Sequence, residues 1–477
     1  MKQYTVTFQP EGTVVTVPEG TDLLQAQILA GLRPDAPCGG KGTCGKCRVF
    51  LDGEEVLACM TPVNRDMTVC TGRKEAVQIL TSGQQISIQP DGEHEYVLAF
   101  DIGTTTVVAY LLDGYTGALL AQSSTLNPQS QFGADVISRI QYALKDESNA
   151  MSGCIRDAMM HLAAETAVKA GIQPDQITAS AIVGNTAMHH LLLGIHPKPL
   201  VTPPYMPAVT EAMELQGARF LPNIAGFVGG DTVGCMVSTR FDRQEELTLL
   251  IDIGTNGEMV LGNRHRRIAC STAAGPAFEG AKISCGMRGA AGAVDHVTLE
   301  KGKISYHVIG DTAPKGLCGS GLLDLVAVLL EQEIIDESGR LENKQFPLCD
   351  NVVLTQKDVR EVQLAKAAIR AGIELLAQQL GVQVEEIQQV FLAGAFGNYM
   401  DPASACRIGM IPPVLLDRIV PIGNAAGEGA KLCALSRAEF TYSQELAKHT
   451  EFLELASLPQ FQDCYVDALE FCEEDDE

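Results

Sequence analysis

Residues 97–108 read VLAFDIGTTTVV, and residues 249–260 read LLIDIGTNGEMV. Each copy is a hydrophobic run that ends in Asp-x-Gly-Thr and is followed by a second run. Short apolar runs bounded by a glycine turn are typical of buried β-strands. The pattern therefore predicts two β-hairpins with the same kind of turn, placed about 150 residues apart along the chain.

The two predicted turns are suited to phosphate. Small residues there let backbone N–H groups and threonine hydroxyls approach phosphate oxygens closely. The aspartates at the strand ends, Asp101 and Asp252, are suited to hold Mg²⁺ through water. Two such hairpins predict two related subdomains that grip a nucleotide from opposite sides, and their spacing is too long for a solenoid repeat.

Two later segments have the same character. Residues 390–398 read VFLAGAFGN and residues 420–430 read VPIGNAAGEGA, and each is a strand that runs into glycines. Together with the hairpins they resemble the superfamily of acetate and sugar kinases, Hsp70 and actin. The resemblance implies a duplicated ribonuclease-H-like α/β fold that encloses ATP. In it, the first connecting segment is 228–231, the adenosine loop is 394–397 and the second connecting segment is 423–429.

The resemblance also assigns roles to single residues. The implied nucleotide-binding residues are Gly103, Thr104, Thr105, Thr106, Gly254, Thr255, Asn256, Gly257, Gly394, Phe396, Gly397, Gly423 and Asn424. Asp231 matches the acidic residue that orients the attacking water or hydroxyl, so it joins Asp101 and Asp252 as a candidate catalytic residue. From the residues alone, Asp231 is equally suited to be a helix N-cap before 232–237. The segment 273–280, AAGPAFEG, is either a mobile loop over the phosphates or a tightly packed turn.

The N-terminal region carries a second motif. Residues 38–47 read CGGKGTCGKC, and eleven residues separate Cys47 from Cys59. Four thiolates hold a [2Fe-2S] cluster, so Cys38, Cys44, Cys47 and Cys59 are the predicted ligands. The glycines let the backbone wrap around a compact anion and point N–H groups toward the sulfurs. Zinc sites usually have two close cysteine pairs rather than one, and a redox Cys-x-x-Cys leaves Cys38 and the glycines unexplained.

Strands and a helix are predicted around this cysteine loop. The runs 4–8 and 13–17 flank a Pro-Glu-Gly turn, and 48–51 and 54–57 flank an Asp-Gly turn, which predicts two hairpins. Thr21 is the expected N-cap of a helix between them. The region resembles plant-type and adrenodoxin-type ferredoxins, which are α+β proteins of the β-grasp fold. The fourth cysteine comes sooner here than in free ferredoxins, which leaves Cys70 as the alternative to Cys59.

These patterns divide the chain into a ferredoxin-like domain (1–82), a linker (83–95) and an ATPase domain (96–477) with subdomains of about 96–245 and 246–477. The net charge of −24 repels phosphate backbones and anionic lipid, which disfavours nucleic acid and membrane partners. No apolar run reaches the ~18 residues of a transmembrane helix, and the first residues lack a signal peptide. Fifteen cysteines without an export signal indicate a reduced, cytoplasmic location.

A one-electron cluster joined to an ATPase suggests that ATP drives an electron onto an acceptor that a ferredoxin alone does not reduce. Over nearly its whole length the chain resembles the reductive activators of corrinoid proteins. That resemblance implies ATP-dependent reduction of Co(II) to Co(I), with a corrinoid protein and a low-potential electron donor as partners, and leaves a homodimer open. The alternatives are an activator of a radical dehydratase, a nucleotide-gated electron-transfer or sensor module, and a kinase.

Overall fold

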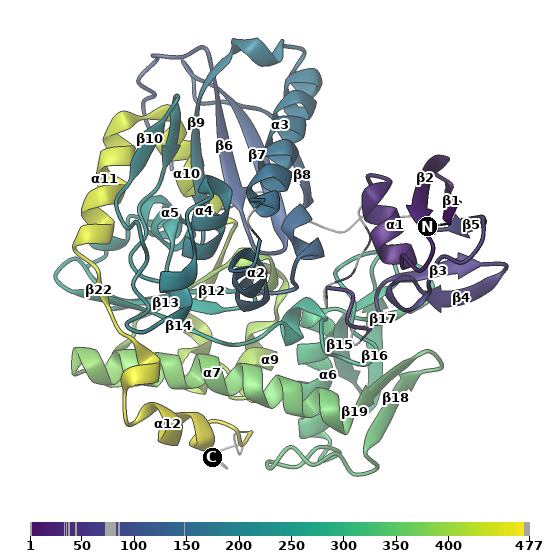
Figure 1. Cartoon of the computed structure of the whole chain (residues 1–477). Helices are drawn as coiled ribbons and strands as arrows, with labels where there is room; N and C mark the ends of the chain where they lie inside the picture. The colour runs from purple at the N-terminus through teal and green to yellow at the C-terminus, as the bar shows by residue number, and fades with distance from the viewer. Residues whose placement is uncertain are drawn as a thin grey trace.

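The computed structural model describes residues 2–32, 34, 36, 39–42, 45–71, 83, 86–146 and 148–471. The first part of the chain forms a small separate domain, drawn in purple in Figure 1. Its elements are β1 (Gln3–Gln9), β2 (Thr13–Pro18), α1 (Leu23–Leu29), β3 (Arg48–Leu51), β4 (Glu54–Leu57) and β5 (Met67–Cys70). The five strands form one sheet in the order β2-β1-β5-β3-β4, and α1 covers it.

Both predicted N-terminal hairpins are confirmed. β1 pairs antiparallel with β2, and β3 pairs antiparallel with β4. The second hairpin turns through Asp52 and Gly53, whose φ angles of 54° and 85° are those of a tight hairpin turn. The predicted N-cap of α1 is wrong by one residue. Asp22 rather than Thr21 caps the helix, because the Asp22 side chain accepts a hydrogen bond from the Gln25 backbone N–H.

The rest of the chain is built on two six-stranded sheets. The first contains β6 (Tyr96–Ile102), β7 (Thr106–Asp113), β8 (Leu119–Leu126), β9 (Ile177–Gly184), β10 (Met213–Leu215) and β11 (Ala218–Phe220). The second contains β12 (Thr248–Ile253), β13 (Gly257–Gly262), β14 (Arg267–Thr272), β20 (Gln389–Ala393), β21 (Ile419–Gly423) and β22 (Glu451–Phe452).

The two sheets share one topology. In each, three antiparallel strands in sequence order continue into two parallel strands: β8-β7-β6-β9-β11 in the first sheet and β14-β13-β12-β20-β21 in the second. This is the ribonuclease-H-like order, present twice. The predicted fold class, a β-grasp domain followed by a duplicated α/β ATPase fold, is therefore confirmed.

Helices cover both sheets and fill the space between them (Figure 1). They are α2 (Val136–Ala143), α3 (Ala150–Ala170), α4 (Thr186–Leu193), α5 (Gly230–Thr239), α6 (Gly319–Glu331), α7 (Gln356–Leu380), α8 (Gly394–Tyr399), α9 (Pro402–Arg407), α10 (Ala425–Leu435), α11 (Arg437–Lys448) and α12 (Phe461–Asp467). α5 and α10 pack against each other in a core that also contains side chains of both sheets, such as Val97 and Leu250. α3 and α7 cover the outer faces. Among the described residues, no helix combines the length and apolar character needed to cross a membrane.

A small sheet lies beside the purple N-terminal domain (Figure 1). It consists of β15 (Ala293–Glu300), β16 (Lys303–Val308) and β17 (Gly316–Leu317), and the hairpin of β18 (Gln345–Cys349) and β19 (Val352–Thr355) is nearby. The insertion that carries β15 to β19 follows the second Asp-x-Gly-Thr hairpin. The N-terminal domain thus faces the half of the chain that begins at β12.

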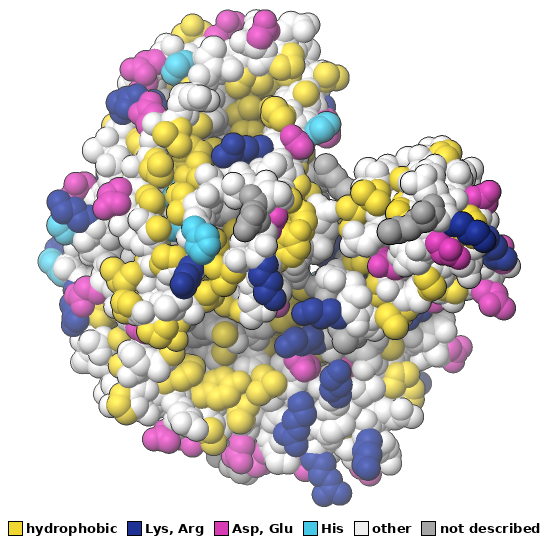
Figure 2. All heavy atoms as spheres, in the orientation of Figure 1, with side chains coloured by type: hydrophobic (Ala, Val, Ile, Leu, Met, Phe, Trp, Pro, Cys, Tyr) yellow, Lys and Arg dark blue, Asp and Glu magenta, His cyan; other side chains and the backbone are white. Residues whose placement is uncertain are grey.

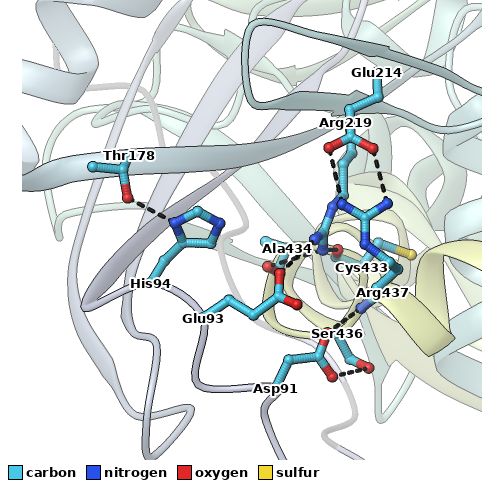
Figure 3. Close-up of polar contacts among 10 residues, drawn as sticks. All are labelled: Asp91, Glu93, His94, Thr178, Glu214, Arg219, Cys433, Ala434, Ser436 and Arg437. Atoms are coloured by element: carbon cyan, nitrogen blue, oxygen red, sulfur yellow. Dashed lines mark hydrogen bonds and ion pairs between the residues drawn. The ribbon is translucent and has the colours of Figure 1, made fainter.

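The described part of the linker is docked onto the larger part of the chain. Asp91 accepts hydrogen bonds from the Ser436 hydroxyl and the Arg437 backbone N–H, which satisfies the first turn of α11. The buried Arg219 donates to the carbonyl of Cys433, 2.9 Å away, near the end of α10. Figure 3 shows these contacts with those of Glu93, His94, Thr178, Glu214 and Ala434. The described part of the linker therefore lies against the end of α10 and the start of α11.

Candidate active site

A cavity of about 300 Å³ lies between the two Asp-x-Gly-Thr hairpins. Most of the predicted nucleotide residues line it: Asp101, Gly103, Thr104, Thr105, Thr106, Asp231, Asp252, Gly254, Thr255, Asn256, Gly394, Phe396 and Asn424. The first five come from the β6–β7 hairpin and the next ones from α5 and the β12–β13 hairpin. The fold thus brings together side chains that are far apart in the sequence.

Three predicted residues are not among those that line the cavity: Gly257, Gly397 and Gly423. A Cβ atom at Gly257 would lie 2.8 Å from the Thr272 hydroxyl, so this glycine allows strands to pack closely. A Cβ atom at Gly397, in α8, would lie 3.4 Å from the Leu392 side chain, which is ordinary van der Waals contact. Gly423 ends β21 with a φ of 66°, which favours glycine. We assign these three glycines to the backbone that supports the cavity.

Each hairpin turn is held in place by backbone hydrogen bonds. The Gly103 N–H donates to Thr106 O, and the Gly254 N–H donates to Asn256 O, both over 2.9 Å. Asn127 braces the first turn, because its side-chain amide donates to the Gly103 carbonyl over 2.8 Å. Bracing of this kind fixes the turn before any ligand arrives, which lowers the entropic cost of binding.

Four carboxyl groups lie at the floor of the cavity: Asp101, Asp231, Asp252 and Glu258. Burial is the main cause that raises their pKa values, and the negative charges of the neighbouring carboxylates raise three of them further. The pKa of Asp101 rises to about 6 and those of Asp231 and Asp252 to about 7, while that of Glu258 lies well above its usual range. Such a group of carboxylates is stabilised by a cation.

Asp231 is the second residue of α5, so the N-cap alternative for it is wrong. The N-cap is Gly229, and α5 begins at Gly230. A Cβ atom at Gly229 would lie 2.4 Å from the Thr186 backbone nitrogen, so only glycine lets the two helix starts approach each other here. The close approach places the Asp231 carboxyl in the cavity beside Asp252.

The predicted adenosine loop is the first turn of a helix rather than a loop. Strand β20 ends at Ala393, and α8 starts at once with Gly394. Gly394 has a φ of 82°, and a Cβ atom there would lie 2.4 Å from an Asp252 carboxyl oxygen. The sequence correctly placed residues 394–397 at the end of a strand. Four small residues, however, are compatible both with a glycine loop and with a tight junction between a strand and a helix.

Asn424 connects the second connecting segment to the first hairpin strand. Its side-chain oxygen accepts a hydrogen bond from the Gly427 N–H over 2.8 Å, which caps α10. Its side-chain amide donates to Asp101 over 2.8 Å and to the Tyr110 hydroxyl over 3.0 Å. The bond to Asp101 lowers the pKa of that carboxyl and partly offsets the effect of burial.

Four charged residues of the cavity were missed by the sequence reasoning: Glu258, Glu279, Arg288 and Asp295. Glu258 directly follows the second hairpin turn, and this position was the available signal. Glu279 belongs to the segment 273–280, which lines the cavity with Phe278 and Glu279. The Glu279 carboxylate accepts hydrogen bonds from the hydroxyls of Thr105 and Thr255, one from each hairpin. No sequence pattern marked Arg288.

Positive charge is concentrated near this site, although the chain is strongly acidic. Figure 2 shows the molecule as spheres in the orientation of Figure 1. The surface is hollowed between the N-terminal domain and the part of the chain that carries α3 and β8. Lys and Arg side chains gather below this hollow, over the region of β15 to β19. Arg288 lines the cavity itself. A local excess of positive charge attracts anionic ligands and partners.

The second candidate site is the cysteine loop. Cys47 is buried, and its sulfur lies 3.3 Å from that of Cys59. Cys59 lies in the short 3₁₀ helix η1 (Ala58–Met60), directly after the β3–β4 hairpin. Cys70 is an exposed residue of β5. Cys38 and Cys44 lie outside the described residues.

The glycines of this loop fit a cradle around a compact group. Gly39, Gly40, Gly42 and Gly45 all have positive φ angles, between 62° and 84°. A Cβ atom at Gly42 would lie 2.8 Å from the Met60 sulfur. Two converging thiols on a backbone that glycines adopt readily fit part of a cluster site that four thiolates hold.

Three family models match the chain. Residues 6–64 match the 2Fe-2S iron-sulfur cluster binding domain, residues 96–244 match the RACo middle region, and residues 246–477 match the C-terminal domain of RACo, the ASKHA domain. The matched middle region carries the first Asp-x-Gly-Thr hairpin, and the matched C-terminal domain carries the second.

One curated relative and one solved structure cover the chain almost completely. It is 37% identical to the corrinoid activation enzyme RamQ of Eubacterium limosum, over 91% of this chain and 94% of that protein. It is 30% identical to a Methanosarcina barkeri protein named [Co(II) methylated amine-specific corrinoid protein] reductase, over 55% of this chain and 54% of that one. The solved structure of a reductive activator for a corrinoid,iron-sulfur protein matches with a TM-score of 0.70 and 28% identity, covering 98% of both chains. The chain therefore belongs to the family of corrinoid activation enzymes.

Proposed function

We propose that this chain is an ATP-dependent reductase that activates a corrinoid protein by reducing its Co(II) to Co(I). One observation carries the proposal. A single chain combines a cysteine loop in which two thiols converge with a cavity that both phosphate hairpins line. The family relationship over 91% of the chain supports the same function.

The cluster ligands that we propose are Cys38, Cys44, Cys47 and Cys59. The 3.3 Å separation of the Cys47 and Cys59 sulfurs supports the choice of Cys59 over Cys70, because the β3–β4 hairpin carries Cys59 back to the loop. Once bound, a [2Fe-2S] cluster supplies one electron at a time at a low potential. The protein's own part is to hold the thiolates and to point backbone N–H groups at the sulfurs, which tunes that potential.

The nucleotide-binding residues that we propose include hydroxyl groups for the phosphates and carboxyl groups for a cation. Thr105 and Thr255 offer hydroxyls from opposite hairpins, and Asp101 and Asp252 lie at the strand ends beneath them. Among the described residues, no three His, Cys, Asp or Glu side chains converge on one metal ion. We therefore infer that the aspartates hold Mg²⁺ through water and through the nucleotide's phosphate oxygens, which suits the preference of Mg²⁺ to keep several waters.

Asp231 is the proposed base of hydrolysis. Its pKa of about 7, raised by burial and by Asp252, allows its carboxylate to take a proton from an attacking water near neutral pH. Asp101 and Asp252 lie close enough to influence this pKa. A bound cation at the two aspartates would lower the pKa of all three groups, so metal binding and proton transfer are coupled here.

We propose that ATP is needed because the Co(II)/Co(I) couple has a lower reduction potential than the cluster. A tenfold less favourable equilibrium corresponds to about 59 mV for one electron. A nucleotide that binds one conformation more tightly than another shifts the population by the difference of the two affinities. We propose that ATP binding and hydrolysis change how the N-terminal domain and the corrinoid partner are held, so that the electron is passed on and not returned. A low-potential donor restores it, and a homodimer is one assembly that could place the partners.

The test is an ATP-dependent change in cobalt oxidation state. Purified protein with its cluster is mixed with a corrinoid protein in the Co(II) form, a low-potential reductant and Mg-ATP, and the absorption band of Co(I) is followed. We expect the band to form with ATP and not with a non-hydrolysable analogue. Equal formation of Co(I) without nucleotide would contradict the proposal. Nucleotide binding without hydrolysis would instead indicate a nucleotide-gated electron-transfer module.

A further inference from the structure

The carboxylate of Glu279 joins the two phosphate hairpins across the cavity. One of its oxygens accepts a hydrogen bond from the Thr105 hydroxyl, and the other accepts one from the Thr255 hydroxyl. Glu279 belongs to the short 3₁₀ helix η6 (Ala277–Glu279) in the insertion after β14. The Glu279 carboxyl group therefore occupies the position between the two hairpins.

A nucleotide must displace this carboxylate. Each threonine hydroxyl has a single proton to donate, and both protons are used by Glu279. Phosphate oxygens that bind the same hydroxyls therefore compete with Glu279. The negative charge of the phosphates also repels a carboxylate at the same position. Binding of the nucleotide and release of Glu279 are consequently a single exchange.

The segment that carries Glu279 also contacts the N-terminal domain. The Lys46 ammonium donates to the carbonyl oxygens of Gly280, 3.4 Å away, and Gly286, 2.6 Å away. Lys46 stands between Gly45 and Cys47, so it belongs to the cysteine loop. Glu279 is directly bonded to Gly280 in the chain. Two adjacent residues thus provide the group between the phosphate hairpins and a contact of the cysteine loop.

The two carbonyls that Lys46 contacts differ in how firmly they are held. The segment around Gly286 is fixed to β17, because the Met287 N–H donates to Leu317 O and the Leu317 N–H donates to Cys285 O, each over 2.8 Å. The Gly280 N–H donates within its own short helix, to Ala277 O. A Cβ atom at Gly286 would lie 2.3 Å from the Gly280 carbonyl oxygen, so the two glycines are in direct contact. A shift of Glu279 therefore moves one acceptor of Lys46 relative to the other.

We propose that Glu279 is a nucleotide-sensing latch that couples the phosphate hairpins to the seating of the cysteine loop. Without nucleotide, Glu279 holds both threonines, and Lys46 binds both carbonyls. With nucleotide, the phosphates take the threonines, Glu279 and Gly280 move away, and Lys46 loses an acceptor. The N-terminal domain is then freed to approach its redox partner. This inference rests on the proposed binding of ATP between the hairpins, and it specifies which contact transmits the signal.

The first test measures the accessibility of Lys46 in the full-length protein with its cluster bound. An amine-reactive acyl ester is applied briefly, and labelling of each lysine is measured by peptide mass spectrometry. Lys41 lies exposed in the same loop and serves as the internal control. We expect the labelling of Lys46 relative to Lys41 to rise at least threefold when a non-hydrolysable ATP analogue is added.

The second test uses two variants that each remove one negative charge from the cavity. Glu279→Gln removes the latch, whereas Asp295→Asn removes a cavity carboxylate that binds His307 instead of the threonines. Glu279→Gln should bind the ATP analogue about tenfold more tightly, because the amide carries no negative charge and keeps one acceptor oxygen for the two hydroxyls. It should also show high Lys46 labelling with or without nucleotide. Asp295→Asn should keep the nucleotide-dependent change in labelling.

The outcomes separate this inference from the proposed function. If the wild-type protein does not bind the analogue, the nucleotide site itself is wrong. If it binds the analogue but Lys46 labelling stays the same, ATP binding stands and the latch is refuted. Weaker nucleotide binding by Glu279→Gln would also refute the latch and would instead assign Glu279 to the support of Mg²⁺. Equal nucleotide affinity and equal Lys46 labelling in Glu279→Gln and Asp295→Asn would also refute the latch. Loss of any one negative charge from the cavity would then explain the effect.

Discussion

Replacing Asp101 by asparagine removes one of the half-buried negative charges of the cavity floor while nearly keeping the shape of the side chain. The pKa of Asp101 is raised from 3.8 to about 6, chiefly by burial. Because the value in the folded protein lies above that of the unfolded chain, ionisation lowers stability as the pH rises through about 6. The asparagine variant does not carry this cost.

The size of the effect follows from the same shift. At about 1.36 kcal/mol per pKa unit, ionised Asp101 costs the folded protein about 3 kcal/mol at pH 8. At pH 5 the carboxyl of the folded protein is mostly protonated, and the cost falls to about 1.6 kcal/mol. The hydrogen bond from Asn424 survives, because the asparagine side-chain oxygen also accepts from that amide. Asp101→Asn should therefore be more stable than the wild-type protein, and more so at pH 8 than at pH 5.

The assay is urea unfolding without nucleotide and in the presence of a chelator. The chain has no tryptophan, so far-ultraviolet circular dichroism of its helices provides the signal. Asp417→Asn, at an exposed position, is the matched control and should change little at either pH. No gain in stability for Asp101→Asn, or an equal gain at pH 5 and pH 8, would refute the reasoning. The variant should at the same time lose affinity for Mg-ATP, since the charge that destabilises the folded protein is the one that we propose to hold the cation.

Three further predictions follow from the same structure. Asp231→Asn should slow ATP hydrolysis by about 10²-fold to 10⁴-fold while nucleotide binding persists, as measured by phosphate release and equilibrium dialysis; unchanged turnover would remove Asp231 from the mechanism. Cys59→Ser should lose the visible absorption and iron content of the cluster whereas Cys70→Ser keeps both, and the reverse result would exchange the two cysteines as ligands. Arg219→Met should lower the free energy of unfolding by about 2 kcal/mol, because carbonyls at the end of α10 lose a buried donor. Arg437→Met, at an exposed ion pair, should leave urea unfolding nearly unchanged, and equal losses in the two variants would contradict the role of burial.

The sequence by itself determined the local elements of this protein. Alternating and continuous apolar runs with glycine turns between them predicted the N-terminal hairpins and the hairpins at Asp101 and Asp252. The repetition of Asp-x-Gly-Thr predicted the duplicated fold, because the same local pattern must form the same local structure twice. Strand period and turn chemistry act over a few residues, so they can be read without knowing the rest of the chain.

Short-range patterns did not resolve helix starts. Asp231 was equally compatible with an N-cap and with the first turn of a helix, and residues 394–397 were compatible with a loop. The structure decided both, because Gly229 and Gly394 approach other backbone and side-chain atoms so closely that the chain must turn there. Those approaches depend on where neighbouring elements lie, which no window of sequence contains.

Only the tertiary structure decided which groups meet across the cavity. Asn424 reaches Asp101 from 323 residues away, Glu279 reaches Thr105 from 174 residues away, and Lys46 reaches Gly286 from 240 residues away. No periodicity relates such pairs, because each depends on how two separately formed sheets and an inserted segment are packed. The sequence therefore determined that a nucleotide site and a cluster loop are present, while the packing between them determined which contacts can carry a signal from one to the other.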